Sequence, residues 1–127
     1  STMSFGTELH TLLSSDASLN TYCDDGIYYE LYPTNIGTKK TGMVYTFNKT
    51  GVISCMTGGL GATNYSLTIT VKTPDALKLE TINDYLVKLL HGYTSGGIQI
   101  IEFQNDDHFM SLEEETYSNI LNFSAIY

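Results

Sequence analysis

The chain has 127 residues, of which 42% are hydrophobic and 16% are charged, and its formal net charge is −8. This length suits one domain with a single core, and the composition is too apolar for a disordered chain. All six basic residues are lysines, so the sequence lacks the arginine forks through which sequence-reading proteins contact DNA. No stretch approaches the roughly 20 apolar residues of a membrane-spanning helix. We therefore expect one domain, residues 1–127, with no membrane segment and no sequence-specific contact with nucleic acid.

The first expected elements are helical. A helix begins near Phe5, because leucines recur after it at helical spacing and Ser4 can cap its start. A short second turn is expected over residues 17–22. The turn Asp24-Asp25-Gly26 then leads into a β-prone run over residues 27–32.

The middle of the chain predicts a hairpin followed by the clearest strand. Odd positions over residues 43–47 are bulky and apolar, residues 48–51 (Asn-Lys-Thr-Gly) are expected to turn, and residues 52–56 return. A glycine-bearing tip over residues 57–63 leads into residues 64–72, where apolar and polar residues alternate strictly. The apolar face of that strand carries Tyr65, Leu67, Ile69 and Val71.

A long helix is expected next, starting at Thr73-Pro74-Asp75 with Thr73 as the cap and ending at Gly92. A strand over residues 97–103, an acidic connection and a strand over residues 117–127 complete the chain. The apolar stripe of the helix consists of Leu79, Ile82, Leu86, Leu89 and Leu90. This order predicts an α+β fold, with a single mostly antiparallel β-sheet of four to five strands, two helices on one face and a protruding β-hairpin.

The residues with chemical potential do not form a recognisable catalytic or metal site. Asp106-Asp107-His108 is an acid–histidine cluster, but adjacent residues mostly point apart, whereas metal ligands converge from several elements. The consecutive carboxylates of residues 113–115 repel one another. The glycines of residues 58–61 lead into a strand and lack the Gly-Lys-Ser/Thr of a phosphate loop. We expect no enzymatic activity, no metal and no cofactor.

Cys23 and Cys55 lie in separate segments with no Cys-x-x-Cys spacing. Residues 1–5 show no basic region followed by an apolar run, so we expect no secretory signal. Without export, two such cysteines are expected to stay reduced and to pack as small apolar residues.

Taken in order, these segments resemble the tail-completion or tail-terminator family of long-tailed bacteriophages, over about Phe5 to Tyr127. The resemblance rests on the leucine helix with its second turn (Leu9 to Tyr22), Gly26-Ile27-Tyr28, the strand ending at Val44-Tyr45, the glycine-bearing hairpin, the strand Tyr65 to Lys72 leading through Thr73 into the long helix, the strand Ile98 to Phe103, and the ending Leu121 to Tyr127.

The resemblance implies a structural protein that caps the head-proximal end of the tail tube as a hexameric ring. Such a ring stops tube polymerisation and offers the surface to which the head is joined. The implied partners are further copies of the same chain, the tail tube protein and the head–tail connector protein, and a monomer in dilute solution is compatible with a hexamer on the tail. The implied location is the neck of the virion, after assembly in the host cytoplasm. DNA would pass through the ring. An acidic protein suits the lining of such a channel, because negative charge keeps the passing DNA from adhering.

The partner surfaces are expected in polar segments that have little reason to be ordered in a lone domain. These segments are residues 34–42, 57–63 and 106–115. The candidate interface residues within them are Lys39, Lys40, Gly58, Gly59, Gly61, Asp106, Asp107, Glu113, Glu114 and Glu115.

Two other functions stay open. One is another neck component, a head-closure or connector protein, which would share the small size and ring symmetry. The other is a cytoplasmic small-ligand-binding module with Tyr28, Tyr29 and Tyr32 as its pocket wall. Strand alternation puts Tyr29 on the opposite face from the other two tyrosines, which favours ordinary sheet packing over a shared pocket.

Overall fold

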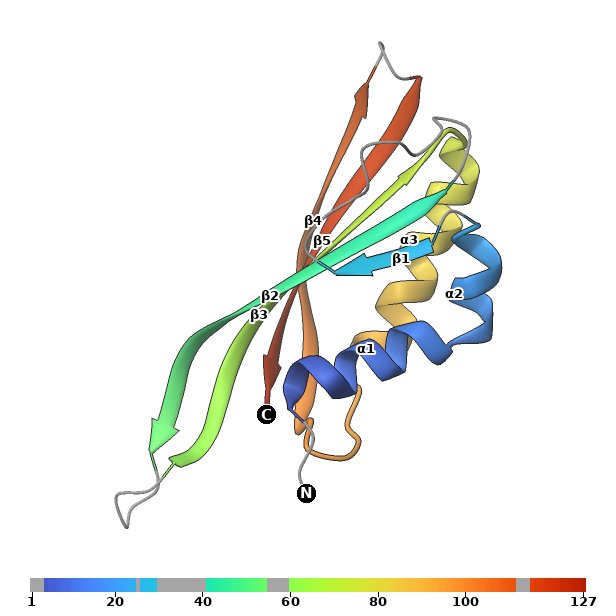
Figure 1. Cartoon of the computed structure of the whole chain (residues 1–127). Helices are drawn as coiled ribbons and strands as arrows, with labels where there is room; N and C mark the ends of the chain where they lie inside the picture. The colour runs from blue at the N-terminus through green and yellow to red at the C-terminus, as the bar shows by residue number, and fades with distance from the viewer. Residues whose placement is uncertain (1–3, 25, 30–40, 55–59, 112–114) are drawn as a thin grey trace.

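The computed structural model describes residues 4–24, 26–29, 41–54, 60–111 and 115–127 (Figure 1). The elements are α1 (Phe5–Ser15), α2 (Ala17–Tyr22), β1 (Gly26–Tyr29), β2 (Gly42–Ser54), β3 (Leu60–Thr73), α3 (Ala76–Leu90), β4 (Ile100–Ser111) and β5 (Thr116–Ile126). The strands form one sheet in the order β1-β2-β3-β5-β4, with β1 parallel to β2 and the other neighbours antiparallel. The expected α+β class with a mostly antiparallel sheet is confirmed.

The core lies between one face of the sheet and the helices, which cover that face (Figure 1). Tyr45 of β2 lies opposite Ile69 of β3, and Ile69 lies opposite Leu121 of β5. All three side chains are buried. The helices contribute Phe5, Leu9, Leu13, Leu19, Leu79, Ile82, Leu86 and Leu90 to the same core. None of the described helices is both long and apolar enough to cross a membrane.

The ends of the helices are set by polar side chains. Ser4 caps α1 as expected, since its Oγ accepts a hydrogen bond from the Thr7 N–H at 3.2 Å. The expected second turn is a short helix, α2. The predicted cap of α3 was wrong: Asp75, not Thr73, accepts the first free N–H groups of the helix. Thr73 stays in β3, where its buried hydroxyl bonds to the Thr41 hydroxyl at 2.8 Å.

The expected turn over residues 48–51 was also wrong. Strand β2 runs without interruption from Gly42 to Ser54, and a β-bulge between Lys49 and Gly51 absorbs the extra residue. The pairing with β3 resumes beyond it, with Val52 opposite Thr63. A bulge bends and twists a strand without ending it, which is why turn-like residues do not reverse the chain here. The protruding hairpin that the sequence predicted exists, but it is longer than expected (Figure 1).

The acidic connection after residue 103 is in fact strand. β4 extends to Ser111, so Asp106 and Asp107 pair with Leu121 and Ile120 of β5. A bulge between Phe103 and Asn105 again makes the extension possible. The strongly β-prone partner strand therefore overrides the weak strand propensity of the acidic residues.

Cys23 is buried at the end of α2 and is a free thiol. Burial raises the pKa of this thiol to about 11, so it is neutral at physiological pH and packs as a small apolar residue. The expectation that Cys23 packs as a small buried residue is confirmed, whereas Cys55 lies outside the described residues.

Candidate functional site

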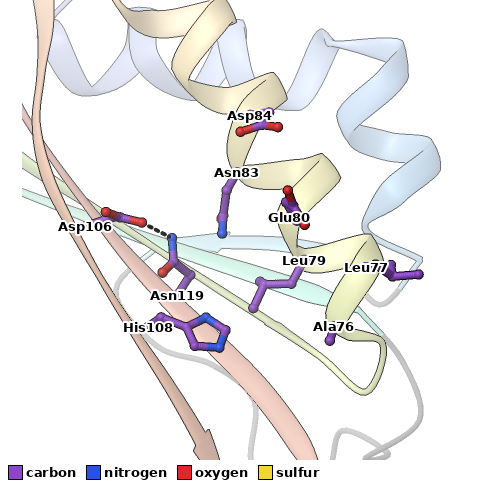
Figure 2. Close-up of a pocket in the computed structure, with 9 residues that line it drawn as sticks. All are labelled: Ala76, Leu77, Leu79, Glu80, Asn83, Asp84, Asp106, His108 and Asn119. Atoms are coloured by element: carbon purple, nitrogen blue, oxygen red, sulfur yellow. Dashed lines mark hydrogen bonds between the residues drawn. The ribbon is translucent and has the colours of Figure 1, made fainter.

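A polar pocket lies between α3 and the last two strands, and Figure 2 shows the side chains that surround it. Its volume is about 420 Å³. The lining residues are Ala76, Leu77, Leu79, Glu80, Asn83 and Asp84 from α3, Asp106 and His108 from β4, and Asn119 from β5. The sheet register explains the composition, because alternation puts Asp106 and His108 on the helix-covered face and Asp107 on the other.

The pocket is rich in hydrogen-bond acceptors. The Asn119 side chain is 1% exposed, and its Nδ2 donates to an Asp106 carboxylate oxygen at 3.2 Å. Among the described residues, the buried Oδ1 atoms of Asn119 and Asn83 have no donor. The part of the chain that the structure describes contains no group of three or more His, Cys, Asp or Glu side chains placed to hold a metal ion. The pocket can accept hydrogen bonds from donor groups of another protein, but its geometry gives no reason to assign it a catalytic role.

The outer edge of β4 is covered in its first half only. The Gly92 N–H donates to the Ile101 carbonyl at 2.7 Å, and the Phe103 N–H donates to His91 Nδ1 at 3.0 Å. Residues 104–110 are all exposed, including Phe109 at 48% and Met110 at 53%. Within the described ranges, no other strand or loop pairs with the outer edge of these residues.

The opposite edge of the sheet is also partly uncovered. The described residues of β1 pair with residues 42–45 of β2. From Thr46 to Ser54, β2 has a partner on its β3 side only, as far as the structure describes the chain. A mostly apolar groove of about 490 Å³ lies at the start of this free stretch, lined by Ser4, Gly6, Thr7, His10, Tyr29, Tyr45 and Phe47. Among the described residues, these two uncovered stretches lie at opposite edges of one sheet, and we call them the β2 edge (residues 46–54) and the β4 edge (residues 104–110).

A hydrogen-bonded cluster around Glu8 ties α1 to the end of β5. Hydrogen bonds from the Tyr127 hydroxyl and from the Gly97 N–H, the latter at 2.9 Å, lower the pKa of Glu8. The bond to Glu8 raises the pKa of Tyr127 to about 12. A Cβ atom on Gly97 would lie 2.7 Å from the Tyr127 ring, so only glycine allows this approach. Sequence reasoning missed the cluster, and the adjacent glycines of residues 96–97 were the signal available.

The predicted interface residues do not form one cluster. Asp106 lines the pocket, Asp107 lies on the other face of the same strand, and Glu115 occupies the turn before β5 with a φ of 55°. Gly61 lies in β3. The remaining candidates, Lys39, Lys40, Gly58, Gly59, Glu113 and Glu114, lie outside the described residues.

The tyrosines considered as a pocket wall are only partly described. Tyr29 lines the apolar groove beside Tyr45, with ring centroids 5.3 Å apart, while Tyr32 lies outside the described residues. Tyr28 is not among the residues that line the groove. The described part of the tyrosine run therefore serves packing between β1 and β2.

No protein-family model matches the sequence, and no curated protein sequence is similar to it. The structure is similar to a chain in the virion of a native gene transfer agent particle, with a TM-score of 0.67 and 16% sequence identity. The match covers 93% of this chain and 90% of the other. At this identity the likeness shows a shared fold over nearly the whole of both chains.

Proposed function

We propose that this chain is a structural component of a phage-like particle that caps the head-proximal end of the tail tube as a ring. The observation that carries the proposal is the likeness to a gene transfer agent virion chain, which covers 93% of this chain and 90% of that one. Little of either chain therefore lies outside the matched region. The match supports a role for the whole domain in a particle of that kind, in agreement with the order of segments in the sequence.

The shape of the molecule supports assembly. A domain that forms rings needs two different surfaces that fit each other, because one self-complementary surface would give only a dimer. The β2 edge and the β4 edge are two such surfaces on opposite sides of the sheet. A net charge of −8 suits a ring through which DNA slides, since it disfavours adhesion of the phosphate backbone.

The proposed role needs neither catalysis nor a cofactor. The acid–histidine cluster is divided between the two faces of β4, and nothing in the polar pocket activates a nucleophile. The proposed partners are further copies of the chain, the tail tube protein and the head–tail connector protein. The candidate interface residues are those of the two edges, which include Asp106 and Asp107, together with Glu115.

Deletion of the gene tests this proposal. Electron microscopy of the resulting particles should show tails of uncontrolled length that are not joined to heads, because nothing stops polymerisation of the tube. Supply of the wild-type protein in trans should restore tails of defined length. Tails of normal length beside heads that leak DNA would instead identify a head-closure protein, and normal complete particles would exclude both neck functions.

A further inference from the structure

We infer that neighbouring copies of this chain join by strand pairing, with the β4 edge of one copy lying antiparallel against the β2 edge of the next. The inference rests on the proposed function and names the contact that would build the ring. The partner is therefore a second copy of the chain, and the contact is between two unlike edges.

The backbone provides the first argument. An uncovered edge strand presents N–H and C=O groups that pair with another strand unless the protein hides them. The structure covers the β4 edge up to Phe103 through the 91–93 segment and then stops, although the strand continues to Ser111. In the part of the chain that the structure describes, β1 likewise pairs with β2 only to Tyr45, while β2 continues to Ser54. Among the described residues, both edges are thus covered near the body of the domain and uncovered in its protruding parts.

Charge selects which edges can pair. Asp106 and Asp107 are the charged residues of the β4 edge apart from its histidine, and Lys49 is the charged residue of the β2 edge. Two β4 edges would bring carboxylates together and two β2 edges would bring lysines together, and like charges directly opposite each other are destabilising. A β4 edge against a β2 edge brings opposite charges together. The sequence therefore disfavours a symmetric dimer and favours a head-to-tail contact, which gives a ring when the rotation between successive copies closes.

The strand directions and faces agree with this pairing. β2 and β4 run in opposite directions within the sheet, as its order of antiparallel pairs requires, so a copy that continues the sheet places them antiparallel. Lys49 lies opposite Tyr65 and Asp106 lies opposite Leu121, which puts both charges on the helix-covered face. In a continued sheet they can form a cross-strand pair.

The positions of the two edges determine how the copies are arranged. The β2 edge belongs to the hairpin that protrudes from one end of the molecule, and the β4 edge belongs to the opposite end (Figure 1). Pairing of the β4 edge with the β2 edge therefore shifts each copy along the strand direction relative to its neighbour. A sheet that closes with such a stagger has strands tilted to the ring axis, by about 35–45° in barrels generally.

A charge exchange tests the contact in particles made without the wild-type gene and with a variant copy supplied in its place. We expect Lys49→Glu and Asp106→Lys each to lower the number of particles with capped tails by roughly tenfold or more, because the like-charge pair recurs at every contact of the ring. The double variant should recover most of that loss. Asp107→Lys has the same charge change on the opposite face, so Lys49→Glu should not rescue it. Thermal midpoints near that of the wild type establish that each variant folds.

Disulfide trapping gives a second readout. Lys49→Cys combined with Asp106→Cys, in a Cys55→Ser background, should yield a ladder of covalent oligomers beyond the dimer in oxidised capped particles, because facing strand residues are close enough for a disulfide. Covalent dimers from either single cysteine variant would overturn the inference, since they require like edges to meet. Folded single charge variants that cap normally, or a double variant without rescue, would also overturn it. If gene deletion still gives uncapped tails, the proposed function stands although the edge contact fails.

Discussion

Glu8 and Tyr127 show how one pair of side chains makes folding stability depend on pH, both at acidic and at alkaline pH. The lowered pKa of Glu8 means that folding favours its ionised form, so its contribution is complete above the ordinary value of 4.5 and is lost as the pH falls below it. The raised pKa of Tyr127 means that folding favours the neutral phenol. That contribution is complete below the ordinary value of 10 and is lost as the pH rises toward about 12.

Tyr127→Phe should therefore lower the free energy of unfolding at neutral pH and weaken its decline above pH 10. The substitution removes the hydroxyl that donates to Glu8 and leaves the ring in place. Urea unfolding at a series of pH values measures both effects. Tyr93→Phe is the matched control, because the described residues give that hydroxyl no partner. An alkaline decline as steep in Tyr127→Phe as in the wild type would contradict the assignment of the bond.

Gly97→Ala should destabilise the fold by about 1–3 kcal/mol, the usual cost of forcing extra atoms into a packed site. The added Cβ would lie 2.7 Å from the Tyr127 ring, whereas on Gly51 its nearest neighbour would lie 3.7 Å away. Gly51→Ala is thus the control and should change the free energy of unfolding by less than about 0.5 kcal/mol. Equal effects of the two substitutions in denaturant unfolding would show that the approach to Tyr127 is not tight.

Among the secondary-structure elements, helix α3 contributes several buried side chains to the core, all from one face of the helix. Leu86 is fully buried, while Leu77 on the same helix is 76% exposed. Leu86→Ala should cost about 2–5 kcal/mol because it leaves a cavity. Leu77→Ala makes the same chemical change without a cavity and should cost less than about 0.5 kcal/mol. Denaturant midpoints measure both, and an unchanged midpoint for Leu86→Ala would contradict the packing of α3 on the sheet.

Local signals in the sequence predicted the elements well where one residue or period decides the structure. The leucine spacing located α1 and α3, Ser4 identified the start of α1, and the alternation from Tyr65 to Val71 identified β3. Local signals failed where a partner strand decides. The residues 48–51 look like a turn, but their pairing with β3 converts them into a bulge, and β5 converts the acidic residues after 103 into strand.

The candidate site was predicted less completely than the fold, for the same reason. The sequence singled out Asp106 as an interface residue, but not the contact with Asn119 or the proximity of α3, because both depend on packing between distant segments. The Glu8 cluster joins residues 89 positions apart through Gly97, which local patterns cannot reveal. The β2 and β4 edges likewise follow from how far the described residues of β1 and of the 91–93 segment cover their neighbouring strands, and only the paired sheet shows that.

For the whole molecule, we expect weak, salt-dependent self-association before assembly. A contact selected by a few exposed charges gains little from each, about 0–1 kcal/mol, and loses that gain as salt screens it. Sedimentation of the purified protein should show mainly monomer at low concentration and more oligomer as concentration rises, with less oligomer in 1 M salt than in 0.1 M salt. A stable dimer that is insensitive to salt would contradict head-to-tail pairing through the edges.

An electron cryomicroscopy reconstruction of the neck of the particle that carries this protein would show directly whether the chain terminates the tail. We expect a single ring of six copies of this fold between the last ring of the tail tube and the head–tail connector. The edges of neighbouring copies should be in contact, and the channel should be open along the axis. Density for this fold at any other position in the particle, or its absence from the finished particle, would contradict the proposal that the chain terminates the tail.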